Sequence, residues 1–305
     1  MATISHAGSP VSFRFLTQSN LMLSNPSLHN PQPDMLFSMN ALRRAWCLVR
    51  RSGQSPGTDG VTMAQFEAHS ERELNRLRQQ ITGGTYQPFP VRRFYIKKSS
   101  GKERPISVWA FRDRVAQRVV HDYLTPILEP LFLDCSFGFR PGRSTGDAVQ
   151  AVIEARDHDL PWVLDADIQD CFGNIPLPLL MGQLKRLVRS PLVIHLIEQW
   201  LHTPVDKQRD QIVGVSQGGV ISPQLANLYL HRFDEMVLAA LPQARLIRFA
   251  DDFVILSRSE QEAVWSLDVT RRSLENLQLA LNMRKTQIVH FEEGFSFLGT
   301  TFDGR

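Results

Sequence analysis

Cysteine is scarce in this sequence: three occur among 305 residues, and no two form a C-x-x-C pair. This spacing argues against a disulfide framework or a structural zinc site. Long apolar runs are also missing, since no stretch approaches the roughly 20 residues that span a bilayer. The N-terminus lacks a charged segment followed by an apolar one. We therefore expect neither membrane insertion nor secretion, and a reducing cytoplasm as the location.

Apolar residues make up 43% of the chain, which is enough for a substantial core. The length suits one large domain or two subdomains, and no internal repeat is visible. Residues 1–35 are rich in Ser, Asn and Pro without sustained periodicity. We expect this segment to be a flexible N-terminal extension that carries no chemistry.

The net charge of +3 hides a strong asymmetry along the chain. Residues 36–118 contain 16 Lys and Arg against 6 Asp and Glu, whereas residues 119–305 carry a net charge of −7. A basic surface suits a phosphate backbone, and clustered acids suit divalent cations. The alternative is that both are ordinary solvated faces.

Two adjacent acids, Asp251 and Asp252, lie between two apolar, β-prone runs at 246–249 and 253–256. This pattern predicts a tight hairpin with the acids at its tip. Two neighbouring negative charges beside a half-buried strand are unfavourable unless a cation or strong hydrogen-bond donors neutralise them. The hairpin is therefore a candidate metal site, and an ordinary polar turn is the alternative.

A second acidic strand is predicted at 161–168, where an apolar run ends in Asp165 and Asp167. These acids are two residues apart and therefore face the same side. Phe172 follows where the chain would turn over the end of the sheet. If Asp167 meets the acids of the hairpin at one sheet edge, the arrangement suits two-metal phosphoryl transfer. Ligands that are all oxygens favour Mg²⁺.

The basic part of the chain contains a predicted hairpin with strands at 91–98 and 104–109. A helix follows at 111–132, with a break expected near Pro126 and Pro130. Cations on these elements could hold a nucleic-acid strand or a triphosphate, although surface hairpins also carry Lys and Arg to discourage edge pairing. Further helices are predicted at 39–51, 62–80, 224–241 and 260–281, with strands at 286–291 and 295–302. Residues 177–202 contain two more helical stripes, which are separated around Ser190 and Pro191.

Three segments, in order along the chain, resemble the catalytic motifs of reverse transcriptases: Asp167-Ile168 with Phe172, residues 217–223, and residues 249–252. Three more segments, 104–106, 137–143 and 297–299, resemble the bacterial group II intron-encoded lineage specifically. That lineage includes retroelement, CRISPR-associated and defence-associated enzymes. The resemblance covers about residue 36 to the C-terminus. One departure is Phe249, where tyrosine is commoner in the family.

The resemblance implies an α+β fold: a right-hand polymerase with fingers and a palm, the palm being an antiparallel sheet flanked by helices. Residues 36–160 would form the basic fingers and 161–305 the palm, with a helical fingers insertion at about 176–213. A thumb is not evident, because the sequence stops shortly after the segment that resembles the primer-holding turn. Either the chain is a fragment, or a noncoding RNA or a protein subunit supplies the thumb surface.

The implied activity is that of an RNA-directed DNA polymerase that makes cDNA by two-metal phosphoryl transfer. Two Mg²⁺ ions are implied, for which Mn²⁺ could substitute. The implied partners are an RNA template, a DNA or RNA primer and deoxynucleoside triphosphates, with no membrane. The alternatives are an RNA-directed RNA polymerase, which Phe172 argues against, and an RNA-binding maturase-like module, which would leave the surviving acids unexplained.

The resemblance also assigns roles to individual residues. Lys285 matches a lysine that protonates or neutralises the leaving pyrophosphate, and Phe172 matches an aromatic gate that excludes a 2′-hydroxyl. Asp165 would have a supporting role or none. Implied metal ligands are Asp167, Ile168, Asp251 and Asp252. Implied nucleotide contacts are Lys98, Arg104, Phe172, Gln217 and Gly218, with Gly219 leaving room for the templating pair. Implied nucleic-acid contacts are Arg112, Arg140, Arg143, Phe297, Leu298 and Gly299.

Overall fold

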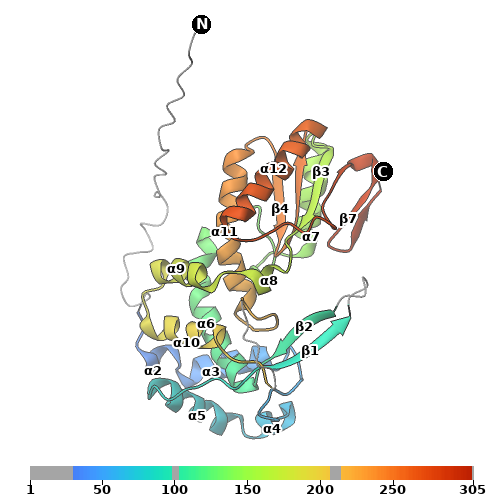
Figure 1. The fold of residues 1–305 in the computed structure, drawn as a ribbon. Coiled ribbons are helices and arrows are strands. Elements are labelled where there is room, and N and C mark those ends of the chain that lie inside the picture. The colour runs from blue at the N-terminus through green and yellow to red at the C-terminus, as the bar shows by residue number, and fades with distance from the viewer. Residues whose placement is uncertain (1–29, 98–102, 207–213, 304–305) are drawn as a thin grey trace.

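The computed structural model describes residues 30–97, 103–206 and 214–303. Figure 1 shows two parts, a helical part that carries a two-stranded ribbon and a part built on a sheet. The helical part begins with short helices that pack around one long helix. Its elements are α2 (Pro33–Leu36), α3 (Met39–Val49), α4 (Met63–Ala68), α5 (Ser70–Thr82), β1 (Arg92–Lys97), β2 (Glu103–Val108), α6 (Phe111–Leu128) and the 3₁₀ turn η1 (Glu129–Leu131).

The second part is an antiparallel four-stranded sheet in the order β4-β5-β3-β6. Its strands are β3 (Trp162–Asp167), β4 (Arg245–Phe249), β5 (Asp252–Ser257) and β6 (Gln287–His290). Helices α11 (Ser222–Ala240) and α12 (Glu260–Asn276) cover one face. Helix α7 (Thr145–Asp157) covers the other face, together with the ribbon of β7 (Phe295–Phe297) and β8 (Thr300–Phe302). The predicted α+β fold with an antiparallel palm sheet is confirmed.

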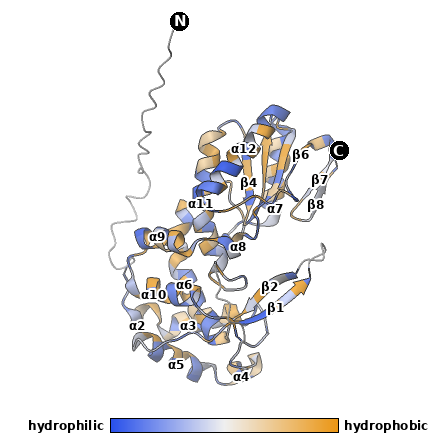
Figure 2. Cartoon of the chain, viewed as in Figure 1, coloured by the Kyte–Doolittle hydropathy of each residue, from blue (hydrophilic) through white to orange (hydrophobic). Residues whose placement is uncertain are grey.

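The sheet is sandwiched between two apolar cores because its side chains alternate between its faces. Leu164 faces the core under α11 and α12, whereas Val163 faces the core under α7. Strand β5 is buried on both faces, which explains its continuous run of apolar residues. These strands are among the most hydrophobic elements in Figure 2.

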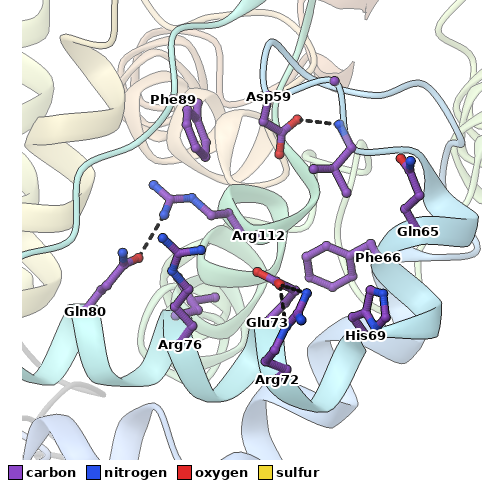
Figure 3. A pocket seen from close by; sticks show the side chains of 13 residues that line it. Asp59, Gln65, Phe66, His69, Arg72, Glu73, Arg76, Gln80, Phe89 and Arg112 are labelled. Carbon is purple, nitrogen blue, oxygen red and sulfur yellow. Dashed lines mark hydrogen bonds and ion pairs between the residues drawn. The ribbon is translucent and has the colours of Figure 1, made fainter.

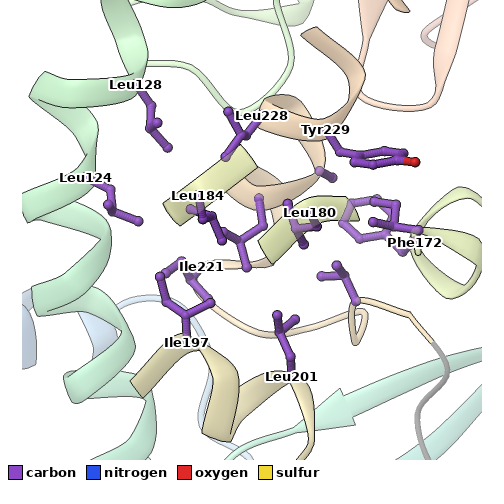
Figure 4. Packing of buried hydrophobic residues seen from close by; sticks show 14 of the residues in the cluster. Leu124, Leu128, Phe172, Leu180, Leu184, Ile197, Leu201, Ile221, Leu228 and Tyr229 are labelled. Carbon is purple, nitrogen blue, oxygen red and sulfur yellow. The ribbon is translucent and has the colours of Figure 1, made fainter. Parts of the chain in front are cut away.

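Five helices and a loop meet in the core between the two parts. Helices α8 (Cys171–Asn174), α9 (Leu177–Leu187) and α10 (Pro191–Leu201) lie between α6 and α11. Figure 4 shows Leu124 and Leu128 of α6, Leu180 and Leu184 of α9, Ile197 and Leu201 of α10, and Leu228 and Tyr229 of α11 around Phe172 and Ile221. We propose the division into fingers and palm given above with one change: α7 goes with the palm, because it packs on β4 and β5.

Several local predictions can be compared with these elements. The helix predicted at 62–80 is instead two helices that meet at His69; Thr62 and Gln65 form a capping box at the start of α4, and Gly83 caps the end of α5. Helix α6 continues through Pro126 and ends at Leu128, and the 3₁₀ turn that contains Pro130 follows, so the predicted break lies between the two prolines. No helix in the described part of the chain has the length and apolarity needed to cross a membrane.

A fully buried arginine, Arg248 on β4, ties the elements of the palm together. Its guanidinium forms two hydrogen bonds of 2.6 Å with the carboxylate of Asp234 on α11. The other N–H groups donate to Asn227 (3.0 Å), to the main-chain oxygen of Ala250 (3.0 Å) and to Ser136 (2.9 Å). All five N–H groups of the side chain therefore have partners.

We predict that Arg248→Met lowers the free energy of unfolding by about 3–5 kcal/mol, because it leaves the Asp234 carboxylate buried without a counter-ion. Urea unfolding followed by circular dichroism measures this change. The control is Arg271→Met, since the Arg271 side chain is 55% exposed in its pair with Asp268 and should contribute under about 1 kcal/mol. Similar losses for the two variants would contradict the role given to Arg248.

Candidate active site

The three predicted acids meet at one edge of the sheet. Strands β3 and β5 pair with Asp167 directly opposite Asp252. The β4–β5 hairpin turns through Ala250, whose φ of 58° is left-handed, and Asp251. The main-chain N–H of Ile168 donates to the main-chain oxygen of Asp251 at 3.2 Å. The predicted hairpin with its acidic tip is therefore present, and it lies beside the end of β3.

A cleft of about 500 Å³ opens beside these acids. Its floor is formed by the ends of β3 and β5, and its walls by the segment before β6 and by the β7–β8 turn. Leu298 and Gly299 form that turn with φ values of 52° and 80°. The lining residues are Asp165, Ala166, Asp167, Asp252, Arg284, Lys285, Thr286, Gln287, Ser296, Phe297 and Leu298. The structure thus brings Lys285, Phe297 and Leu298 to the acids.

Lys285 supplies a positive charge inside this cleft. Its ammonium nitrogen lies 3.0 Å from Oδ2 of Asp167, and the side-chain amide of Asn282 donates to the same oxygen at 2.8 Å. Partial burial lowers the pKa of Lys285, but the hydrogen bond and charge of Asp167 outweigh it, so that the pKa is raised overall. The lysine is therefore protonated at neutral pH.

The negative charges at this edge are crowded. Asp252 is exposed to the cleft, yet the protein around its carboxyl group desolvates it, and Asp251 and Asp167 add repulsion. Together these effects raise the pKa of Asp252 to about 7. Burial and the charge of Asp167 also raise the pKa of Asp165, against a hydrogen bond of 3.0 Å from Gln287. Such crowding is relieved when a cation binds.

The donor chemistry of this edge fits a divalent metal ion. In the described ranges, no group of three or more His, Cys, Asp or Glu side chains is already arranged to hold one. Mg²⁺, however, commonly uses one or two carboxylates and completes its shell with water and substrate phosphates. Asp167 lies directly opposite Asp252, and the charges of Asp251 and Asp167 both raise the pKa of Asp252. The site therefore supplies oxygen ligands with unneutralised charge.

A glycine-rich segment, residues 214–219, connects this edge to the two-stranded ribbon of β1 and β2, here called the fingers ribbon. The N–H of Val215 donates to the main-chain oxygen of Phe172 at 2.7 Å, and the N–H of Ser107 on β2 donates to that of Gln217 at 2.8 Å. Gly218 has φ 105°, and a Cβ at this position would lie 2.2 Å from the Ser107 oxygen. Only glycine allows this approach. The segment thus places Gln217 and Gly218 between Phe172, which its Val215 contacts, and β2.

The other predicted nucleotide contacts are described in part. Phe172 is the second residue of α8, whose N-cap, Asp170, has a left-handed φ of 43°. Phe172 is 6% exposed. Arg104 lies on β2 opposite Ile96, but its side chain lies outside the described part of the structure. Lys98 also lies outside the described residues.

The structure does not bring Arg112 to the acids. Arg112 lines a separate cavity of about 620 Å³ among α4, α5 and the start of α6 (Figure 3). Its guanidinium stacks on Phe89 at 4.2 Å and donates to Gln80 at 2.8 Å and to the main-chain oxygen of Gln87. Its predicted contact with nucleic acid stays a prediction.

Arg140 and Arg143 brace the loop that follows η1. Arg140 is 7% exposed, and its five N–H groups are used by Glu129 and by the main-chain oxygens of Phe132, Leu133 and Ser136. This arrangement leaves Arg140 no donor for a phosphate. Arg143 donates to Asp134 at 2.6 Å and to main-chain oxygens of the same loop. The structure therefore supports a structural role for both residues, and their contact with nucleic acid stays a prediction.

Two residues that hold the acids in place, Asn282 and Gln287, were not predicted from the sequence: Asn282 donates to Asp167, and Gln287 donates to Asp165. Their signal was weak, because both are common surface residues. Asn282 does lie three positions before Lys285. A single polar residue near a predicted active-site lysine was the only pointer to this contact.

Comparisons with known proteins agree with this geometry. Residues 96–302 match the family described as reverse transcriptase (RNA-dependent DNA polymerase). Protein YkfC of Escherichia coli K12 is 33% identical over 292 residues, which cover 83% of this chain and 77% of YkfC. The group II intron-encoded protein LtrA of Lactococcus lactis is 36% identical over 191 residues, or 61% of this chain and 32% of LtrA.

Among solved structures, telomerase from Candida albicans superposes with a TM-score of 0.58 and 13% identity, over 84% of this chain and 53% of the telomerase chain. At that identity the likeness concerns the fold alone, and it agrees with fingers and a palm. The family match spans most of the described fold and includes every acid at the sheet edge. The chain belongs to the reverse transcriptase family of RNA-directed DNA polymerases.

Proposed function

We propose that this reverse transcriptase makes cDNA on an RNA template with two Mg²⁺ ions held by Asp167, Asp251 and the main chain of Ile168, and with Asp252 as a more peripheral ligand. Mn²⁺ would serve as a substitute. The proposal rests on the convergence of the acids at one sheet edge. Asp167 pairs with Asp252 across neighbouring strands, and a main-chain hydrogen bond from Ile168 to Asp251 brings the hairpin turn to the end of β3. Bound metal ions would activate the primer 3′-hydroxyl and stabilise charge on the leaving group.

Lys285 is proposed to act on the leaving pyrophosphate. Its ammonium group is protonated, lies in the cleft and reaches the carboxylate of Asp167. From this position it can neutralise charge that develops on the pyrophosphate and can donate a proton to it. Asn282 keeps the Asp167 carboxylate oriented, because it donates to the oxygen that Lys285 also contacts.

The incoming deoxynucleotide is proposed to bind between the acids and β2. Gln217 and Gly218 pack against β2, and Val215 of the same glycine-rich segment donates a main-chain hydrogen bond to Phe172. Phe172 would pack under the sugar and leave no room for a 2′-hydroxyl, and Lys98 and Arg104 would contact the triphosphate. The size of Phe172 favours a DNA product over the RNA product of an RNA-directed RNA polymerase.

The primer end is proposed to rest on the β7–β8 turn, Phe297–Gly299. Leu298 lines the cleft next to Lys285 and the acids, and the turn is held by the buried ring of Phe297. The RNA template and the primer would run from this turn toward the basic fingers. A noncoding RNA or a protein subunit is proposed as the further partner that supplies thumb function.

The first prediction from this proposal is that Asp251→Asn reduces primer extension at least about a thousandfold, because the amide removes a charge that binds metal. Affinity for a primer–template duplex should change less than about threefold. Extension assays with Mg²⁺ and filter binding measure the two quantities. Asp268→Asn, on the exposed face of α12, is the control. Normal extension by the Asp251 variant would refute the metal assignment.

The second prediction is that Phe172→Val raises the use of ribonucleotides relative to deoxynucleotides by about tenfold or more, because the smaller side chain leaves space for the 2′-hydroxyl. The measurement is the ratio of kcat/KM values for a ribonucleotide and its deoxynucleotide. Phe172 is also a core residue, so the variant should lose stability. The ratio is independent of the folded fraction, and an unchanged ratio would remove Phe172 from the gate.

The third prediction concerns salt. Affinity for a primer–template duplex should fall steeply as salt increases, because each phosphate contact releases counter-ions. Lys97→Gln, on the exposed end of β1, should make the negative slope of log K against log salt shallower by about one, because it removes one phosphate contact. Lys185→Gln on α9 is the matched control. A flat response in the unmodified protein would exclude the fingers ribbon as the binding surface.

A further inference from the structure

An exposed aromatic side chain stands next to the acidic hairpin and has no role in the mechanism above. Phe139 lies in the loop after η1, and 58% of the residue is exposed. Its φ of 57° is in the left-handed region, which is unfavourable for a bulky side chain. Its ring centroid lies 5.9 Å from that of Phe249, with the planes tilted by 48°. An exposed ring on an unfavourable backbone calls for an explanation beyond core packing.

The backbone just before Phe139 is fixed to the hairpin. The N–H of Arg248 donates to the oxygen of Cys135 at 2.7 Å, and the N–H of Phe137 donates to the oxygen of Arg248 at 2.8 Å. The loop thus pairs with β4 like a short parallel strand. The main-chain oxygen of Gly138 accepts a hydrogen bond of 2.7 Å from the buried Asn227.

Gly138 adds a close contact to these hydrogen bonds. A Cβ at this position would lie 2.5 Å from the main-chain nitrogen of Ala250, the residue before Asp251. The loop therefore touches the turn that carries the acids. This contact and the hydrogen bonds of residues 135–138 fix the backbone from which the ring of Phe139 projects.

The position of Phe249 relates this ring to the acids. Phe249 pairs directly with Asp252 across the hairpin. Phe249 and Leu298, from the proposed primer turn, pack against the same buried cluster under α7. Phe139 therefore extends, toward solvent, an apolar surface that borders the acids. Nucleic acid bound at the acids would lie against this surface.

We propose that Phe139 is a stacking platform for one nucleobase of the bound primer–template, and thus a positioning residue for the polymerase reaction. The inference rests on the proposed function. Aromatic rings bind bases through their faces, so the contact tolerates any sequence, as an enzyme that copies varied templates requires. A base that covers the ring would also remove exposed apolar surface from water.

Phe139→Leu tests the proposal, because leucine keeps an apolar side chain and the same backbone demands but removes the ring. The affinity for primer–template, measured by fluorescence anisotropy, should fall about tenfold. Phe139→Tyr keeps an aromatic ring and should bind primer–template with the affinity of the unmodified protein. Trp265→Leu, at a 51% exposed tryptophan on α12, is the matched control and should leave affinity unchanged.

A scan with single abasic nucleotides identifies the base. At one position of the primer or template, the abasic site should weaken binding by the unmodified protein about tenfold and binding by the Phe139→Leu variant hardly at all. Equal losses for both proteins at every position would overturn the proposal and indicate that the ring merely packs on Phe249. If the unmodified protein binds and shows this coupling but extends no primer, the proposed function fails while the platform stands.

Discussion

The architecture of the catalytic edge depends on one buried ion pair, between Arg248 and Asp234. A charge without contact to water is tolerated only when its partners are in place, and here they come from α11, from the loop after η1 and from the hairpin turn itself. The hydrogen bond to the oxygen of Ala250 fixes the peptide immediately before Asp251. Any other path of the hairpin would leave donors of a buried guanidinium unpaired. The ion pair therefore acts less as a source of stability than as a selector of one hairpin geometry.

That geometry concentrates negative charge, which opposes folding. The pKa of Asp252 near 7 reflects the work of bringing carboxylates together at a partly desolvated edge. Lys285 and Asn282 offset part of that work at Asp167. A divalent cation would offset more of it, and so would bind to an edge that the surrounding protein has already organised. Conflict between stability and function is common at active sites.

The sequence predicts this edge well because its signals are local. Apolar runs and alternation identify β3, β4 and β5, and strands of that kind bring Asp167 to the hairpin acids once they pair. The basic residues are harder to interpret, because an arginine has the same sequence signature whether it meets a phosphate or a carbonyl. Arg140 meets carbonyls and Glu129 inside its own loop. Its partners are set by tertiary contacts that no short sequence window contains.

The nucleotide site depends on backbone contact between palm and fingers rather than on side chains alone. Gly214 lies so close to α8 that a Cβ there would be 2.4 Å from the main-chain oxygen of Phe172, and Gly218 lies similarly close to Ser107 on β2. One short segment thus connects Phe172 to the strand that carries Arg104. Main-chain hydrogen bonds fix both ends of this segment, to Phe172 and to Ser107 on β2. In the proposed function, discrimination of the sugar by Phe172 and contact of Arg104 with the triphosphate would therefore be coupled through the same glycine-rich segment.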